Sequence, residues 1–135
     1  ENSGDGAQGI CVPALVVDTS YPELAGHHAG CDGSRPYSTD CNAAIHRFCG
    51  ATGRTTGFGP VATAGGVRVA CVPDAEVVTT TYTELSAHHA GCTTASRIGG
   101  ECNAAMHRFC IARGAVSGFG PLESSGDTAI VGCVR

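Results

Sequence analysis

The chain has 135 residues, nine of them cysteine, with a formal net charge of −4 and no lysine among its eight basic residues. This balance argues against a dedicated nucleic-acid-binding protein, because no run of basic residues could follow a phosphate backbone. No apolar run approaches the roughly 18 residues of a membrane-spanning helix, so we expect no membrane insertion.

Three segments of the chain occur twice at one constant offset: HHAGC at 27–31 and 88–92, CNAAIHRFC at 41–49 with CNAAMHRFC at 102–110, and GFGP at 57–60 and 118–121. We therefore divide the chain into a flexible N-terminal segment (1–9), a first repeat (10–71) and a second repeat (72–135). No linker separates the repeats, so we expect them to pack as one compact pseudo-two-fold body.

In chain order, each repeat is predicted to fold as strand, helix and strand. The β-branched stretches 11–17 and 71–78 favour opening strands. Residues 21–30 and 82–91 are ambiguous, with Thr83 as the N-cap if the second is helical. Residues 41–49 and 102–110 form the main helices, and GFGP is a turn before the closing strands 67–72 and 129–134. The predicted fold class is α+β, with two tandem, small, disulfide-rich β-α-β repeats.

The cysteines are expected to form disulfides that brace these small repeats. Cys41 and Cys49 cannot pair, because eight helical residues rise about 12 Å, beyond the roughly 7 Å reach of a disulfide. One connectivity that we expect leaves Cys11 alone; its four pairs are Cys31–Cys41, Cys92–Cys102, Cys49–Cys71 and Cys110–Cys133. The mirror choice, Cys11–Cys49 with Cys71–Cys110, leaves Cys133 alone, and sequence does not decide between them. An unpaired cysteine would be free or would link two chains as a homodimer.

Metal binding is the alternative use of these residues. His28, Cys31, His46 and Cys49 have spacings that zinc accepts, although such a set would leave other thiols over. A second metal set would combine Glu23 and His27, which share a helix face, with His28 and His46. We prefer disulfides, which imply an extracellular or periplasmic protein, and expect neither metal nor cofactor.

Polar side chains shared by the two repeats are the candidate binding residues. Imidazole, carboxylate, amide and guanidinium groups together suit a polyhydroxylated ligand, because each sugar hydroxyl both donates and accepts. A tyrosine in each repeat could stack on a sugar ring. The predicted ligand-binding residues are Tyr21, Glu23, His27, Asn42, His46 and Arg47 in the first repeat, and Tyr82, Glu84, His88, Asn103, His107 and Arg108 in the second.

The function predicted from these residues is a secreted, bivalent, lectin-like protein that binds a glycan or polysaccharide and is not an enzyme. The equally long but dissimilar loops 32–40 and 93–101 would tune the two sites. One alternative is a metal- or carboxylate-dependent hydrolase, with Glu23 and Asp40 or Glu84 and Glu101 as its acids. The other alternative is a disulfide-rich protein-binding or inhibitory module.

Overall fold

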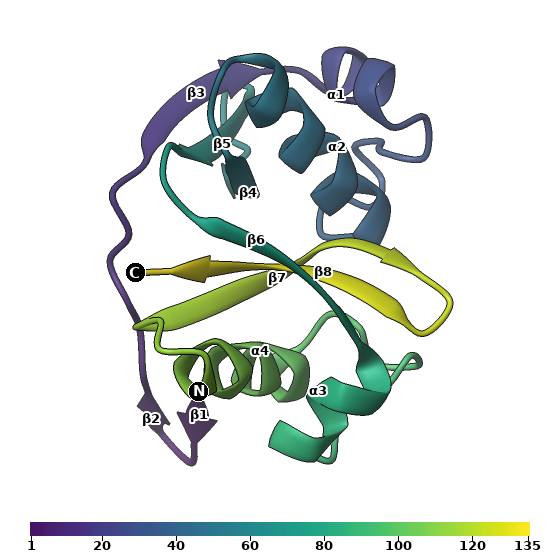
Figure 1. The fold of residues 1–135 in the computed structure, drawn as a ribbon. Helices are drawn as coiled ribbons and strands as arrows, with labels where there is room; N and C mark the ends of the chain where they lie inside the picture. The colour runs from purple at the N-terminus through teal and green to yellow at the C-terminus, as the bar shows by residue number, and fades with distance from the viewer.

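The computed structural model covers residues 1–135, and residues 2 and 3 lie outside the part whose side chains it describes. The chain is mixed α+β, as predicted, with the same order of elements in both halves (Figure 1). The first half contains β3 (Leu15–Thr19), α1 (Tyr21–His27), α2 (Thr39–Ala51), β4 (Thr56–Ala62) and β5 (Val67–Val72). The second contains β6 (Glu76–Thr81), α3 (Tyr82–His88), α4 (Gly100–Ala112), β7 (Ser117–Ser125) and β8 (Thr128–Val134).

Each half forms a three-stranded antiparallel sheet with its last strand in the middle. The strand orders are β3-β5-β4 and β6-β8-β7. Figure 1 shows the second sheet lying between α2 on one side and α4 on the other, and both helices contact β7. A separate core fills each half, around Ile45 and Val69 in the first and around Met106 and Val131 in the second.

The two short helices settle the ambiguity left by the sequence. Both form, and each begins after a hydroxyl side chain that accepts a hydrogen bond from a glutamate backbone N–H: Ser20 from Glu23, and Thr81 from Glu84. The N-cap of α3 is therefore Thr81, so the prediction of Thr83 was wrong. The extended backbone of Thr81 leaves its oxygen facing the open N–H groups of the first turn.

The GFGP segments lie in strands β4 and β7, so their prediction as turns was wrong and each half has three strands rather than two. Gly57 pairs with Cys71 and packs on the buried disulfide of Cys49. A Cβ atom at Gly57 would collide with Cys49 Sγ, as would one at Gly118 with Cys110 Sγ. These glycines are thus fixed by packing, and the register shift in each strand follows immediately afterwards.

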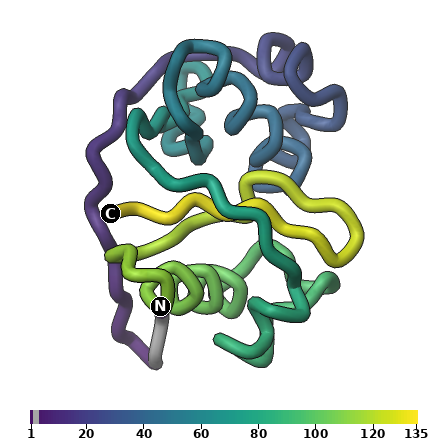
Figure 2. The backbone as a smooth tube through the Cα atoms, in the orientation of Figure 1, coloured from purple at the N-terminus to yellow at the C-terminus, as the bar shows by residue number. Residues whose placement is uncertain are grey.

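The opening strands begin later than predicted. The first, β3, starts at Leu15 rather than residue 11, and Cys71 belongs to the end of β5, while β6 starts at Glu76. The preceding N-terminal arm (residues 1–14) carries β1 (Asn2–Ser3) and β2 (Gly6–Ala7). Figure 2 traces residues 4–14 of this arm along one side of the molecule, from the end near α4 to the sheet of the first half. Its predicted flexibility stays a prediction.

Four disulfides brace the two halves, in the connectivity that leaves Cys11 unpaired among the described residues: Cys31–Cys41, Cys49–Cys71, Cys92–Cys102 and Cys110–Cys133. In each half, one bond closes the loop before the long helix and the other ties the end of that helix to the central strand. All eight sulfurs belong to buried residues, so the bonds form part of both cores.

Replacing both Cys49 and Cys71 by alanine should destabilise the protein by about 3 kcal/mol, because it frees a 22-residue loop in the unfolded chain. Replacing Cys31 and Cys41, which close a 10-residue loop, should cost less. Urea unfolding of the two double variants measures both values. An equal or larger loss from the short loop would contradict this account.

Candidate functional site

The two long helices carry the same three polar residues. These are Asn42, His46 and Arg47 on α2, and Asn103, His107 and Arg108 on α4. His46 Nδ1 lies 2.8 Å from Thr56 Oγ1, and its twin His107 Nδ1 lies 2.9 Å from Ser117 Oγ. Both hydroxyl residues are buried at the start of the neighbouring strand. Each histidine is therefore held to its own sheet through one ring nitrogen.

The arginines that follow these histidines are anchored in the same way in both halves. Arg47 Nη1 donates to the carbonyl oxygen of His27 at 3.2 Å, and Arg108 Nη1 donates to that of His88 at 3.1 Å. Beyond this bond, Arg47 reaches Glu123 of the second half and Arg108 reaches Glu1 of the N-terminal arm. Arg47 and Arg108 thus share one local geometry, and they differ in what they meet beyond it.

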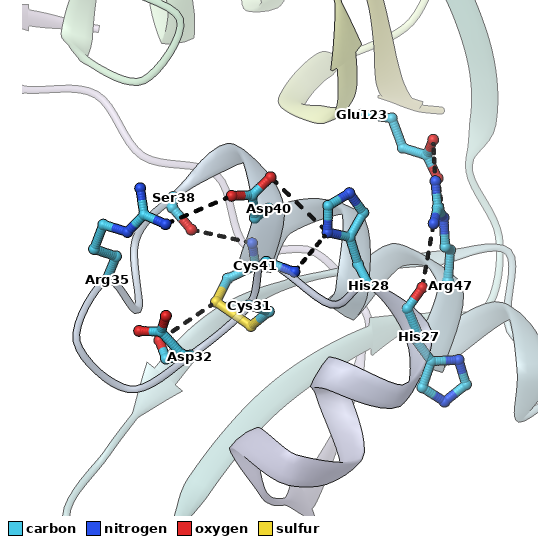
Figure 3. Close-up of polar contacts among 11 residues, drawn as sticks. His27, His28, Cys31, Asp32, Arg35, Ser38, Asp40, Cys41, Arg47 and Glu123 are labelled. Carbon is cyan, nitrogen blue, oxygen red and sulfur yellow. Dashed lines mark hydrogen bonds and ion pairs between the residues drawn. A yellow bond between two sulfur atoms is a disulfide. The ribbon is translucent and has the colours of Figure 1, made fainter.

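In the first half, this helix face binds strand β7 of the second half. Arg47 donates from Nε and Nη2 to the two carboxylate oxygens of Glu123, at 2.7 and 2.9 Å. Asn42 Nδ2 donates to the carbonyl oxygen of Pro121 at 2.9 Å, and Leu122 between them is 2% exposed. Figure 3 shows Arg47 reaching both the Glu123 carboxylate and the His27 carbonyl. Two parallel bonds make this the stronger kind of ion pair.

The electrostatics follow from these contacts. The hydrogen bond from Arg47 lowers the pKa of Glu123, which keeps that carboxyl ionised. The same bond raises the pKa of Arg47. Burial lowers the pKa of His46 below its ordinary value of 6.5, so this ring is neutral near pH 7.

The equivalent face of α4 meets the N-terminal arm instead. Arg108 Nε donates to the Glu1 carboxylate, which makes one hydrogen bond where Glu123 makes two. Asn103 is exposed, and its side chain has no hydrogen-bond partner among the described residues. Beside it is the α4 hollow, a space of about 230 Å³, lined among others by Glu1, Gln8 and Gly9 of the arm and by Asn103, His107 and Ser117.

The contacts between the halves are therefore one-sided. Asn42 and Arg47 bind β7, but among the described residues Asn103 and Arg108 make no matching bonds to β4. Ala62 stands in β4 at the position that Glu123 has in β7, so no carboxylate is offered there. The pseudo-two-fold packing predicted from the sequence is not confirmed.

The remaining predicted binding residues are engaged within their own halves. Glu23 accepts a hydrogen bond from Thr19 Oγ1 at 2.8 Å, and Glu84 accepts one from Thr80 Oγ1 at 2.6 Å. His27 and His88 pack edge-on against phenylalanine rings of the long helices, with centroids 5.7 Å apart. Asn103 and His107 line the α4 hollow, and Arg108 is linked to it through its bond to Glu1, whereas Glu84 and His88 do not line it.

The two tyrosines differ in exposure. Tyr82 is 1% exposed, and its hydroxyl hydrogen-bonds with Ser124 Oγ. Burial raises the pKa of this phenol. Tyr21 is half-buried against the first core. Tyr82 therefore has no free ring face for stacking on a ligand in this arrangement.

The second histidine of each HHAGC segment faces an acidic residue of the long helix. His28 Nδ1 lies 3.9 Å from Asp40 Oδ1, which Arg35 also approaches, as Figure 3 shows. His89 Nδ1 lies 2.8 Å from Glu101 Oε2, without the alignment of a hydrogen bond. These contacts link the HHAGC turn to the helix start, and they occupy Asp40 and Glu101, the predicted partner acids of a hydrolase.

Metal ligation is limited by the disulfides. Cys31 and Cys49 are both oxidised, so the sulfurs of the zinc set are not thiolates. Within the described part of the chain, no three histidine, cysteine or acidic side chains come together as a metal-binding group.

A second hollow, of about 260 Å³, lies where the halves meet. The rings of Phe58 and Phe119 stand 5.3 Å apart there, in an edge-to-face contact between β4 and β7. Both rings are half-buried, so they fasten the halves together more than they face solvent.

Comparisons with known proteins give no relative: no family model, curated protein or solved structure matches this chain. None of the helices described in the structure is long and apolar enough to cross a membrane.

Sequence reasoning missed Glu1, Leu122 and Glu123, because it searched for residues that the two halves share. None of the three is shared by the two halves: Glu1 and Glu123 each bind the arginine of one long helix, and Leu122 is buried beside Glu123 in β7. The signal that could have found Glu123 is the contrast of a glutamate with Ala62 at matching positions of two otherwise similar strands.

Because burial lowers the pKa of His46, the folded state favours its neutral form. The neutral His46 therefore contributes its full share of folding stability above pH 6.5. This contribution is lost as the pH falls through the lowered pKa that His46 has in the folded protein. H46Q, which keeps a polar group near Thr56, should therefore lose less stability than the parent protein between about pH 7 and pH 5. Urea unfolding at a series of pH values tests this, and identical pH slopes would refute it.

Proposed function

We propose that this protein is a secreted protein-binding module with one binding surface, the α4 face, made of Asn103, His107, Arg108 and Ile111. The observation that carries the proposal is that α2 and α4 have the same polar residues on their surfaces but make different contacts with them. On α2, Asn42 and Arg47 hold a polypeptide strand, whereas on α4 the same residue types leave Asn103 unbonded and Arg108 with a single carboxylate bond.

The α4 face has the composition of a surface that binds a partner. Ile111 is 47% exposed, and it lies two turns along the helix from Asn103 and one from His107, on the same side. In α2 the matching position is Gly50, so this apolar group is an addition of the second half. Arginine beside an exposed apolar side chain is typical of interface centres.

Secretion is the part of the proposal that rests on the disulfides. Bonds of this kind persist in oxidising compartments, and small domains use them where the core alone is marginal. Both halves are small and each contains two such bonds.

A second candidate function is carbohydrate binding in the α4 hollow, as the sequence predicted. The free amide of Asn103, the outer ring nitrogen of His107 and the nearby Gln8 would serve the hydroxyls of a sugar. At about 230 Å³, the hollow is smaller than a typical site for a drug-sized ligand and suits a single sugar ring. The protein would then have one site rather than two, because Asn42 and Arg47 are bound to β7.

A display library of linear peptides and an array of glycans, both probed with the intact protein, test the two candidates together. We expect enriched peptides whose binding falls at least about tenfold in N103A and R108Q. R54Q, which removes an arginine outside the α4 face, is the matched control and should bind normally.

Glycan binding that N103A abolishes, without peptide enrichment, would favour the second candidate over the first. Peptides that bind N103A and R108Q as well as the parent protein would overturn the proposed function, as would the absence of any enrichment. Thermal unfolding of each variant checks that the fold is intact.

A further inference from the structure

Two segments of the chain cover equivalent surfaces of the long helices. Pro121–Glu123 of β7 lies on α2, where it meets Asn42 and Arg47. The N-terminal arm lies on α4, where Glu1 meets Arg108 and Gln8 borders the α4 hollow. The two segments share no sequence, so the likeness lies in the surface that each one covers.

The contact with α2 defines what this surface recognises. It takes a backbone carbonyl on Asn42 and, two residues later, a carboxylate on Arg47, and the apolar residue between these two positions is buried. In the bound strand these are Pro121, Leu122 and Glu123. An extended backbone is needed, because carbonyl and carboxylate are reached from one strand that runs along the helix.

The arm satisfies this pattern only in part. Glu1 supplies the carboxylate with one hydrogen bond, and among the described residues Nη2 of Arg108 makes no bond like the one from Arg47 Nη2 to Glu123. Within the described part of the chain, no carbonyl accepts a hydrogen bond from the Asn103 side chain, and the α4 hollow remains beside it. As far as the described residues show, the carboxylate position on α4 is occupied and the carbonyl position is open.

Resting on the proposed function, we propose that the α4 face binds an extended segment of another protein that carries an apolar residue followed by an acidic one. Asn103 takes the carbonyl before the apolar residue, and Arg108 takes the carboxylate through two bonds. The Glu1 carboxylate holds the acidic position until this segment displaces it. The arm is then an intramolecular competitor at the site.

A second copy of this chain is the less suitable occupant. Its β4 would offer Pro60 and Val61, which is 47% exposed, but Ala62 in place of the acidic residue. Its own Glu123 is already bound to Arg47. Charge complementarity with Arg108 therefore favours an acidic segment of a different protein.

The probe for this inference is a fluorescein-labelled peptide of the sequence GFGPLESS, which reproduces residues 118–125. Its binding to the full chain is measured by fluorescence anisotropy. We expect saturable binding that weakens about tenfold when the peptide glutamate becomes glutamine, since a charge-assisted bidentate contact is lost. R108Q and N103A should weaken binding similarly, and R54Q should leave it unchanged.

The competitor role of the arm is tested by E1Q, which removes its carboxylate and keeps its length. Affinity for the peptide should rise several-fold, because the acidic position no longer has to be vacated. Unchanged or lower affinity in E1Q would overturn that role. Sedimentation at the assay concentrations checks for a second copy, and dimers that the peptide dissociates would overturn the choice of partner.

The result separates this inference from the function on which it rests. Library peptides that depend on Arg108 and Asn103, together with no binding of GFGPLESS, would keep the α4 face as a binding surface and overturn its preference for an acidic strand. Equal binding of the glutamate and glutamine peptides would overturn the same preference. Loss of both library and GFGPLESS binding would remove the proposed function itself.

Discussion

The structure depends on a one-sided contact between two similar halves. The long helix of the first half binds strand β7 of the second through Asn42 and Arg47, and Glu123 is the single acidic residue at that position of either sheet. A chain with two such helices and one such strand must leave one helix face without its strand. That face is on α4, and the N-terminal arm covers it with Glu1. The binding surface on α4 thus arises because the chain has two such helices but only one matching strand, and not from a separate sequence motif.

The disulfides make this use of the helices possible. Each long helix is tied to its own sheet through its buried side, at Cys49–Cys71 and Cys110–Cys133, and its histidine is held by a buried hydroxyl. The outer side of the helix is then free to carry polar groups that contribute little to the core. Both halves have the same disulfide and the same histidine contact. The difference between α2 and α4 therefore lies in the segments that contact their outer faces.

The sequence predicted the features that local rules and spacing control. Self-comparison located both long helices, helix geometry excluded a Cys41–Cys49 bond, and one of the two connectivities that we considered is present. It failed where a distant contact decides. The GFGP segment is extended where Gly57 packs on a disulfide, and Tyr82 is buried in the second core, where Ser124 meets its hydroxyl. Above all, repetition selects shared residues, so Asn103 and Arg108 were found while Glu123 and Glu1, which distinguish their surroundings, were not.

The most direct test of the central claim compares two double-mutant cycles in chemical unfolding. One cycle pairs R47Q with E123Q, and the other pairs R108Q with E1Q. The account predicts a clear stabilising coupling between Arg47 and Glu123, and a much smaller one between Arg108 and Glu1. Equal couplings in the two cycles would show that both helix faces are equally satisfied, and would contradict a binding surface on α4.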